Sequence, residues 1–383
     1  MSNQSLRTAI ELFGPNPSFS LRSLRNEFWN VYEKFAKTLE PKPSMPFNSL
    51  RETMDNLTWF PNATGEEGGL GGGYDNPKDL TAKWTWKLQG ITHDEDFWYF
   101  SSEDDEATIA NIGEEGALFK IPKTLPLRDI DRGAVTHVSY PPELARGAGS
   151  YHHIGDIDFV DSWNLIVGAV ESNSGAPPVV ALFDRDLAFR GKARLDHQHE
   201  APWCAVEPRT KLLVSSVFNY SDAGPIELQF YALDRPSPAT VEATWVGNMV
   251  LRDRDGAELK AKGVQGAAFS KRGHLYLAVQ EQINRSDGAL WPAGIRAFDM
   301  LTGRLVLWHN IDFKPGPEEL EGLTLWDADK EYVGIVGGVE VDTGNRPHVP
   351  HGVHGQIHVI MSRNGTSLYF KHYGIIKGSA DDL

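Results

Sequence analysis

One unit recurs five times between residue 88 and residue 383, and this repeat constrains the fold more than any other feature of the sequence. The copies begin 50 to 64 residues apart, and most open on a glycine beside a polar residue. A period of this length, built from short apolar segments, is typical of a β-propeller rather than of a helical solenoid. The five openings are Leu88-Gln89-Gly90-Ile91-Thr92, His153-Ile154-Gly155-Asp156-Ile157, Ala201-Pro202-Trp203-Cys204-Ala205, Val264-Gln265-Gly266-Ala267-Ala268 and Leu320-Glu321-Gly322-Leu323-Thr324.

Each copy contains four predicted strands separated by polar turns. The first strand ends in a turn such as Lys271-Arg272-Gly273, and the second runs apolar, as in His274-Leu275-Tyr276-Leu277. In the last copy we expect the second, third and fourth strands at residues 332–335, 356–360 and 368–373. Four strands in each of five copies predict an all-β, five-bladed propeller over residues 88–383. A six-bladed alternative takes its extra blade from residues 44–87.

Residues 1–87 have a different pattern and form the first predicted region. An apolar stripe at spacings of three and four predicts an amphipathic helix that ends at Pro41 and Pro43. We expect this helix to pack on the propeller, with a partner or membrane helix as the alternative, and the glycine-rich run 68–73 to belong to a covering loop. The stripe consists of Leu21, Leu24, Phe28, Val31, Tyr32, Phe35 and Leu39.

The copy openings and the phrase Gln265-Gly266-Ala267-Ala268-Phe269-Ser270 resemble the broad class of five- and six-bladed propellers. That class includes NHL-type, gluconolactonase-like and phytase-like proteins, so the resemblance implies the fold. The Glu321-Gly322 opening is similar to that of calcium-dependent lactonases, which implies calcium at Glu321. Fold alone does not imply function.

Charge and motifs exclude several classes of function. The chain has 37 Lys and Arg against 52 Asp and Glu, a net charge of −15, and no basic face, which argues against nucleic-acid or anionic-membrane partners. Cys204 is the only cysteine, so no disulfide framework or cysteine-based zinc site is expected, and we predict an inert buried thiol. No nucleotide-cofactor or nucleophile motif is present. Residues 1–16 lack an export signal and no apolar run spans a membrane, so we expect a cytoplasmic protein.

Blade geometry predicts where a site would form. The innermost strand lines the axis, and the second strand returns antiparallel, so the start of the first lies beside the end of the second. Four of the five predicted second strands end in glutamate. These positions, together with polar residues of the openings, give the candidate catalytic residues Glu103, Asp156, Glu171, Glu281, Glu321, Glu340 and His153.

Converging carboxylates allow three outcomes. Glu321 and Asp156 could hold a divalent cation, Ca²⁺ or Mg²⁺, with help from the amide oxygens of Gln89 and Gln265. One carboxylic acid could instead serve as a general acid beside an ionised base. The acids could also bind arginines or the backbone of the neighbouring blade and serve structure alone.

Other side chains extend the candidate site to substrate binding. Trp203 is either a stacking platform or core, and His93 faces the channel by alternation or is a core histidine. We expect His153 to relay protons. The candidate binding residues are Gln89, His93, Trp203, Asn219 and Gln265.

These features predict an enzyme that processes a small molecule in the central funnel by acid–base chemistry. The candidate reactions are hydrolysis of a glycoside or lactone and protonation-driven cyclisation or rearrangement of a natural product. The alternative is a non-catalytic propeller, either lectin-like or a scaffold. Asp253-Arg254-Asp255-Gly256 lacks the later ligands of a calcium loop and is interpreted as an ordinary turn.

Overall fold

A computed structural model gives the conformation of most of residues 88–376. The residues it describes are 50–52, 88–103, 117–122, 135–145, 151–172, 175–208, 210–219, 224–237, 240–253, 255–270, 273–283, 290–291, 293–310, 318–327, 333–336, 339–342, 353–363 and 367–376. The expected N-terminal helix and glycine-rich covering loop lie outside the described residues.

The described chain is almost entirely β-strand, and its first three sheets each contain four antiparallel strands. The first sheet is β2 (Leu88–His93), β3 (Phe97–Ser102), β4 (Leu118–Pro122) and β5 (Thr136–Val138), and the short helix α4 (Pro142–Ala145) follows it. The second is β6 (Tyr151–Val160), β7 (Leu165–Ser172), β8 (Val179–Asp184) and β9 (Phe189–Arg194). The third is β10 (Cys204–Val206), β11 (Leu212–Ser215), β13 (Glu227–Ser237) and β14 (Thr240–Val250).

The remaining strands form a six-stranded sheet, a four-stranded sheet and one hairpin. The fourth sheet is β12 (Gly224–Pro225), β15 (Lys260–Phe269), β16 (His274–Ile283), β18 (Gly294–Asp299) and β19 (Arg304–Asn310), and β17 (Leu290–Trp291) also pairs with β16. The fifth is β20 (Glu318–Asp327), β23 (Val353–Arg363), β24 (Ser367–Ile376) and β1 (Leu50–Glu52). The strands β21 (Val333–Val336) and β22 (Val339–Asp342) pair only with each other.

Successive sheets pack face to face. Strands such as β7 and β8 are buried over most of their length, because a sheet enclosed between two neighbours has no solvent-facing side. Four apolar clusters fill the spaces between the first and second, second and third, third and fourth, and fourth and fifth sheets. Strand β2 of the first sheet also lies against β20 of the fifth, so the packing returns to its start.

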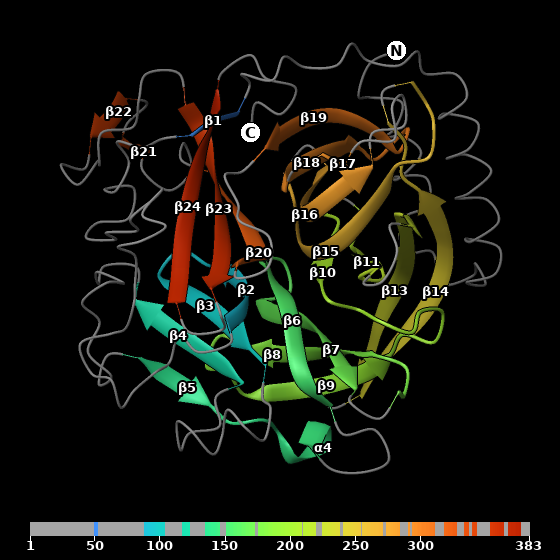
Figure 1. The fold of residues 1–383 in the computed structure, drawn as a ribbon. Helices are drawn as coiled ribbons and strands as arrows, with labels where there is room; N and C mark the ends of the chain where they lie inside the picture. Colours follow the sequence, from blue (N-terminus) through green and yellow to red (C-terminus); the bar gives the residue numbers. More distant parts are fainter. Residues whose placement is uncertain are drawn as a thin grey trace, which may run out of the picture.

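Figure 1 shows the five sheets arranged around a common centre, with β21 and β22 outside that circle. The strands β2, β6, β10, β15 and β20 open the five sheets and contact one another at the centre. We call the line along which they meet the axis. The predictions of an all-β fold and of a propeller-like architecture are confirmed.

The fifth sheet differs from the prediction. The second strand is β23, not the predicted residues 332–335, of which residues 333–335 belong to the hairpin strand β21. A ten-residue β20 pairs along most of its length with the eleven-residue β23, whereas β21 has only four residues. The predicted fourth strand is therefore the third, β24, and residues 50–52 supply the outer strand by pairing with it.

Among the described residues, no helix has the length and apolar character that a membrane span requires.

Candidate active site

A β-bulge interrupts the innermost strand in four of the sheets at the repeated motif. The ladder between first and second strand shifts register between Leu88 and Gly90, between Ile154 and Ile157, between Val264 and Gly266, and between Leu320 and Leu323. A bulge leaves one or two residues unpaired and changes the direction in which they point. The bulged residues are Gln89, Gly155, Asp156, Gln265, Glu321 and Gly322.

The glycines of the motif are required by the close approach of the innermost strands. A Cβ atom on Gly322 would lie 2.4 Å from Asp156 Oδ1 and 2.7 Å from the Cα of Gly90. A Cβ atom on Gly155 would lie 1.8 Å from the carbonyl oxygen of Pro202. Neither position has room for a side chain, so the repeated glycine allows the sheets to meet at the axis.

Asp156 occupies the axis and binds backbone groups of several sheets. Its Oδ1 atom accepts the N–H groups of Ile91 and Ile157, each at 3.0 Å. Its Oδ2 atom accepts those of Ala267 at 2.9 Å and Leu323 at 3.1 Å. The N–H of Asp156 itself donates to the carbonyl of Pro202 at 2.8 Å. This one residue therefore joins β2, β6, β15, β20 and the residues that precede β10.

These contacts correct the roles predicted for Asp156. A carboxylate has about four acceptor positions, and backbone N–H groups fill all four here. The side chain is fully buried, so no substrate or water reaches it. Asp156 fits neither the predicted general base nor the predicted metal ligand, and the pair Glu321 and Asp156 does not fit a divalent cation.

A polar cluster lies at the end of the axis where the innermost strands begin. We call it the entrance and define it as Gln89, Glu103, His153 and Glu171. His153 pairs in register with Glu171 of β7 and forms a backbone bridge with Glu103, which follows β3. The antiparallel return of the second strands thus brings these residues together, as the sequence argument required.

The imidazole of His153 lies between an amide and a carboxylate. Its Nε2 atom is 3.1 Å from Gln89 Oε1, and its Nδ1 atom is 3.6 Å from Glu171 Oε2. The second oxygen of Glu171 accepts the N–H of Ala201 at 2.7 Å, which ties the carboxylate to the third sheet. The side chains of His153 and Glu171 are 25% and 24% exposed, so both are partly open to solvent. A histidine held this way can accept or donate a proton.

Other predicted residues of this end make their contacts elsewhere. Glu281 pairs with Lys262, with 3.9 Å between Oε2 and Nζ. The Asn219 amide donates to the carbonyl of Pro225 at 3.4 Å. Glu321 is buried and Gln265 is partly buried, both at bulges next to the axis.

Three predicted site residues lie away from the entrance. The Trp203 side chain is fully buried and its indole N–H donates to Ser216 Oγ at 3.0 Å, so it is core rather than a stacking platform. His93 lies at the other end of β2, roughly 13 Å of strand beyond Gln89. Its Nδ1 atom is 3.2 Å from Thr324 Oγ1. Glu340 lies on β22 in the separate hairpin, because the fifth sheet takes its second strand from β23.

The predictions of a buried thiol at Cys204 and of an ordinary turn at Asp253 agree with the structure. Cys204 is fully buried, and burial raises the pKa of its thiol well above the ordinary value, so little thiolate forms. Asp253 Oδ1 accepts the N–H groups of Asp255 and Ala257, the pattern of an ordinary turn.

Sequence reasoning missed three residues whose side chains form hydrogen bonds between separate segments of the chain. Glu200 Oε2 accepts the N–H of Phe218 at 3.1 Å, and the buried Gln198 donates to Ser215 Oγ at 2.9 Å. The polar run 196–200 directly precedes the innermost strand of the third sheet, which was the available signal. Tyr140 contacts both β3 and β6, but its position after an outer strand gave no signal.

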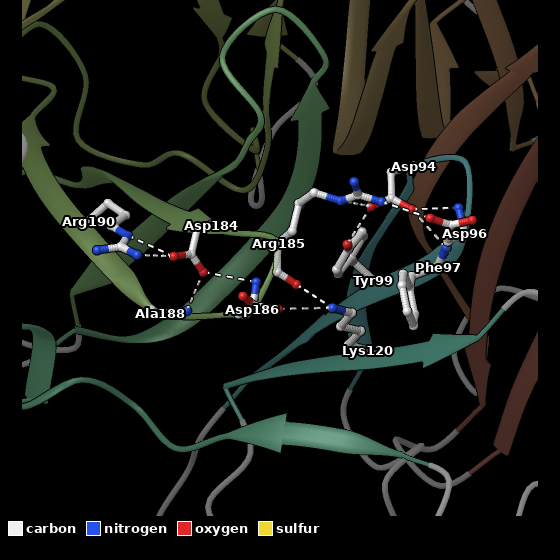
Figure 2. A network of polar contacts seen from close by, with 10 residues as sticks. All are labelled: Asp94, Asp96, Phe97, Tyr99, Lys120, Asp184, Arg185, Asp186, Ala188 and Arg190. Atoms are coloured by element: carbon white, nitrogen blue, oxygen red, sulfur yellow. Dashed lines mark hydrogen bonds and ion pairs between the residues drawn. The ribbon is translucent and has the colours of Figure 1, made fainter.

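A second polar network joins the first two sheets at the opposite end, at the β2–β3 turn (Figure 2). Asp94 Oδ1 accepts the N–H groups of Asp96 and Phe97, and Oδ2 accepts Tyr99 Oη–H and Arg185 Nε–H, both at 2.6 Å. Burial raises the pKa of Asp94, but these hydrogen bonds outweigh it and hold the pKa below the ordinary value. All four acceptor positions are again filled, so this network fastens two sheets.

Metal ligands do not cluster in the part of the chain that the structure describes. No group of three or more His, Cys, Asp or Glu side chains is arranged there to hold an ion.

Comparison with known proteins adds no family. No protein-family model matches the sequence, and no curated protein matches it either.

Solved structures with a similar chain path share little sequence with this protein. The PQQ-bound aldose sugar dehydrogenase from Streptomyces coelicolor aligns with a TM-score of 0.38 and 12% identity, over 75% of this chain and 94% of that one. A glycosyl hydrolase from Bacteroides ovatus aligns with a TM-score of 0.36 and 12% identity, over 88% of this chain and 92% of that one. Hydrazine synthase from Kuenenia stuttgartiensis aligns with a TM-score of 0.35 and 11% identity, over 76% of this chain and 66% of that one. At these scores the similarities carry no argument about function.

Proposed function

We propose that the protein is an enzyme that acts on a small molecule at the entrance, with His153 as the group that transfers protons. The observation that supports this is the placement of the imidazole between Gln89 and Glu171, at 3.1 Å and 3.6 Å, with a quarter of its surface open to solvent. The carboxylate next to Nδ1 fixes the orientation of the ring and stabilises the imidazolium that forms during proton transfer. With Nδ1–H toward the carboxylate, Nε2 carries a lone pair and no proton for Gln89 Oε1. The Nε2 atom therefore faces the reaction when the attacking water replaces the Gln89 contact.

Hydrolysis of a lactone is the reaction that suits one histidine–carboxylate pair best. His153 removes a proton from water as its oxygen attacks the carbonyl carbon, and the resulting imidazolium returns that proton to the ring oxygen as the C–O bond breaks. Gln89 orients the attacking water or a substrate hydroxyl. Glu103, whose backbone pairs with His153, lies where it can bind the same ligand. Atoms and charge balance without a cofactor in this scheme.

One site per chain fits the bulges better than five equivalent sites. A lectin-like propeller repeats nearly the same pocket in each blade, whereas the bulged residues here differ: Gln89, Asp156, Gln265 and Glu321. We propose that the partly exposed Gln265, Glu281 and Asn219 extend the binding surface around the axis. We also propose that the five sheets are five blades of one propeller closed by β1. A bound divalent cation, Ca²⁺ or Mg²⁺, stays a prediction, with Glu321 as its one remaining predicted carboxylate ligand. No step of the reaction above uses a cation. A cytoplasmic location also stays a prediction.

Hydrolysis of a substrate panel tests the proposal. The full chain is assayed with aliphatic γ- and δ-lactones, sugar lactones and p-nitrophenyl glycosides, by proton release or nitrophenol absorbance. For any substrate that is turned over, His153→Gln and Glu171→Gln should lower kcat/KM by about 100-fold or more. The matched controls His199→Gln and Glu242→Gln change exposed residues and should stay within about twofold. Turnover that survives both entrance variants would exclude His153 as the proton-transfer group.

A further inference from the structure

Tyr140 lies in the segment between β5 and α4, and its hydroxyl bridges two sheets. The side chain is 6% exposed. Its Oη–H donates to the carbonyl of Ser102 at 2.5 Å, and the same oxygen accepts the N–H of Ile154 at 3.3 Å. Ser102 ends β3 in the first sheet and Ile154 belongs to β6 in the second.

Both partners of Tyr140 are chain neighbours of entrance residues. Ser102 precedes Glu103, and Ile154 follows His153. Glu103 and His153 in turn pair with each other through their backbones. The hydroxyl therefore sets the distance between the end of β3 and the start of β6 at the place where both carry the proposed site.

The strand β6 needs an external contact at this point. Its ladder with β7 shifts register between Tyr151 and His153 and again between Ile154 and Ile157. Only the two pairs His153–Glu171 and Ile154–Val170 remain between the two irregularities. A strand segment interrupted on both sides is less constrained by its own sheet than a continuous ladder. The Ile154 N–H bond to Tyr140 supplies a constraint from outside the sheet.

We propose that Tyr140 is a positioning residue that holds His153 in register with Gln89 and Glu171. It acts through the backbone of His153 and does not touch the substrate. The inference rests on the proposed function for its effect on turnover, but its effect on the geometry of His153 is independent of any substrate. A shift of about 1 Å in a catalytic group can lower a rate by about 100-fold, so the bridge matters to the chemistry if the site is catalytic.

The variant Tyr140→Phe removes the hydroxyl and keeps the ring. Tyr99→Phe is the matched control, because Tyr99 is also buried between the first two sheets and its hydroxyl donates to Asp94 at the opposite end. We expect both variants to lower the melting temperature by a similar amount. Only Tyr140→Phe should move the side-chain ¹⁵N–¹H signals of His153, which are assigned in the full chain with His153→Gln. For a lactone that the protein hydrolyses, kcat should fall about 10- to 100-fold in Tyr140→Phe with KM within about threefold.

Two results would overturn the inference: His153 signals that stay unchanged in Tyr140→Phe, or signals that move equally in Tyr99→Phe. If no panel substrate is hydrolysed, the proposed function fails while the NMR comparison still decides the positioning role. If Tyr140→Phe does not fold, hydrogen exchange on the unmodified protein decides instead. The Ile154 amide should then exchange at least about 100-fold more slowly than an unstructured amide, and an unprotected Ile154 would refute the bridge.

Discussion

Replacing Asp156 with asparagine changes one atom of a buried side chain and should strongly destabilise the fold. The amide oxygen can keep the two N–H groups of Ile91 and Ile157 that bond to Oδ1. The amide nitrogen then faces the N–H groups of Ala267 and Leu323, which now bond to Oδ2. Donors oppose donors, and rotation of the amide only moves the conflict to the other pair.

The size of the effect follows from the number of donors that lose an acceptor. A buried donor without a partner costs about 1–3 kcal/mol, so the two backbone N–H groups together cost about 2–6 kcal/mol. Whole domains are stable by only about 5–15 kcal/mol, so this loss is a large fraction of the total. Asp156→Asn should therefore unfold at a markedly lower denaturant concentration.

Equilibrium unfolding in urea, followed by tryptophan fluorescence, measures this loss. Asp234→Asn is the matched control, because Asp234 is exposed on β13 and its change should stay within about 0.5 kcal/mol. If Asp156→Asn unfolds within about 1 kcal/mol of the unmodified chain, the axial hydrogen bonds do not hold the sheets together. A variant that is stable yet inactive would restore Asp156 as a catalytic residue and refute the role assigned to it here.

Three further predictions concern stability. Burial raises the pKa of Asp158 to about 7 against an ordinary 3.8. Between these two pH values the folded chain keeps a proton that the unfolded chain has lost, so the free energy of unfolding falls as the pH rises from about 4 to about 7. Asp158→Asn should thus raise the melting temperature at pH 8 and not at pH 4; an equal effect at both would contradict the assignment. Gly322→Ala places a Cβ atom 2.4 Å from Asp156 Oδ1 and should lower the free energy of unfolding in urea by about 1–3 kcal/mol or more. In the control Gly224→Ala, the new Cβ atom meets only the flexible Asn219 amide, at 3.2 Å, so its stability should stay near that of the unmodified chain. Arg185→Gln removes the charged donor from the buried Asp94 and should lower the melting temperature by a few degrees. Arg190→Gln, in the same view (Figure 2), removes only the exposed pair with Asp184 and should not; equal shifts would show that the Arg185–Asp94 contact adds no stability.

The repeat predicted the sheets well because its signals are local. The motif glycine, the polar turn and the apolar second strand each depend on a few neighbouring residues. The first three copies form four-stranded sheets as expected, and the fourth sheet adds the short strands β12 and β17. The last copy failed because strand identity there depends on distant partners. The segment 333–336 has a strand pattern and forms a strand, but β23 pairs with β20, and β1 comes from residues 50–52.

The sequence could not separate the roles of the acidic residues. Asp156 and Glu321 both stand beside a motif glycine, and only the register of the bulges shows that one carboxylate faces four backbone N–H groups. The bulges themselves were not predicted, because a bulge is a mismatch between two strands and neither strand records it alone. The antiparallel return did predict that Glu103, Glu171 and His153 would meet.

The axial carboxylate and the entrance histidine lie on one short segment of β6, and this explains how a fold with so closed an axis can still expose part of the His153 side chain. Asp156 binds the neighbouring sheets from one bulge, and His153 precedes Asp156 by three residues. Tyr140 bonds to Ile154, the residue after His153, and Asp156 two residues further on is fixed to four other sheets, so the imidazole is carried by a strongly constrained part of the fold. A reacting group needs placement to within about 0.5 Å, and a rigid support of this kind provides it more reliably than a surface loop. The irregular ladder of β6 therefore places Asp156 on the axis and His153 at the entrance, a pair of positions that the strand reaches by giving up continuous pairing with β7.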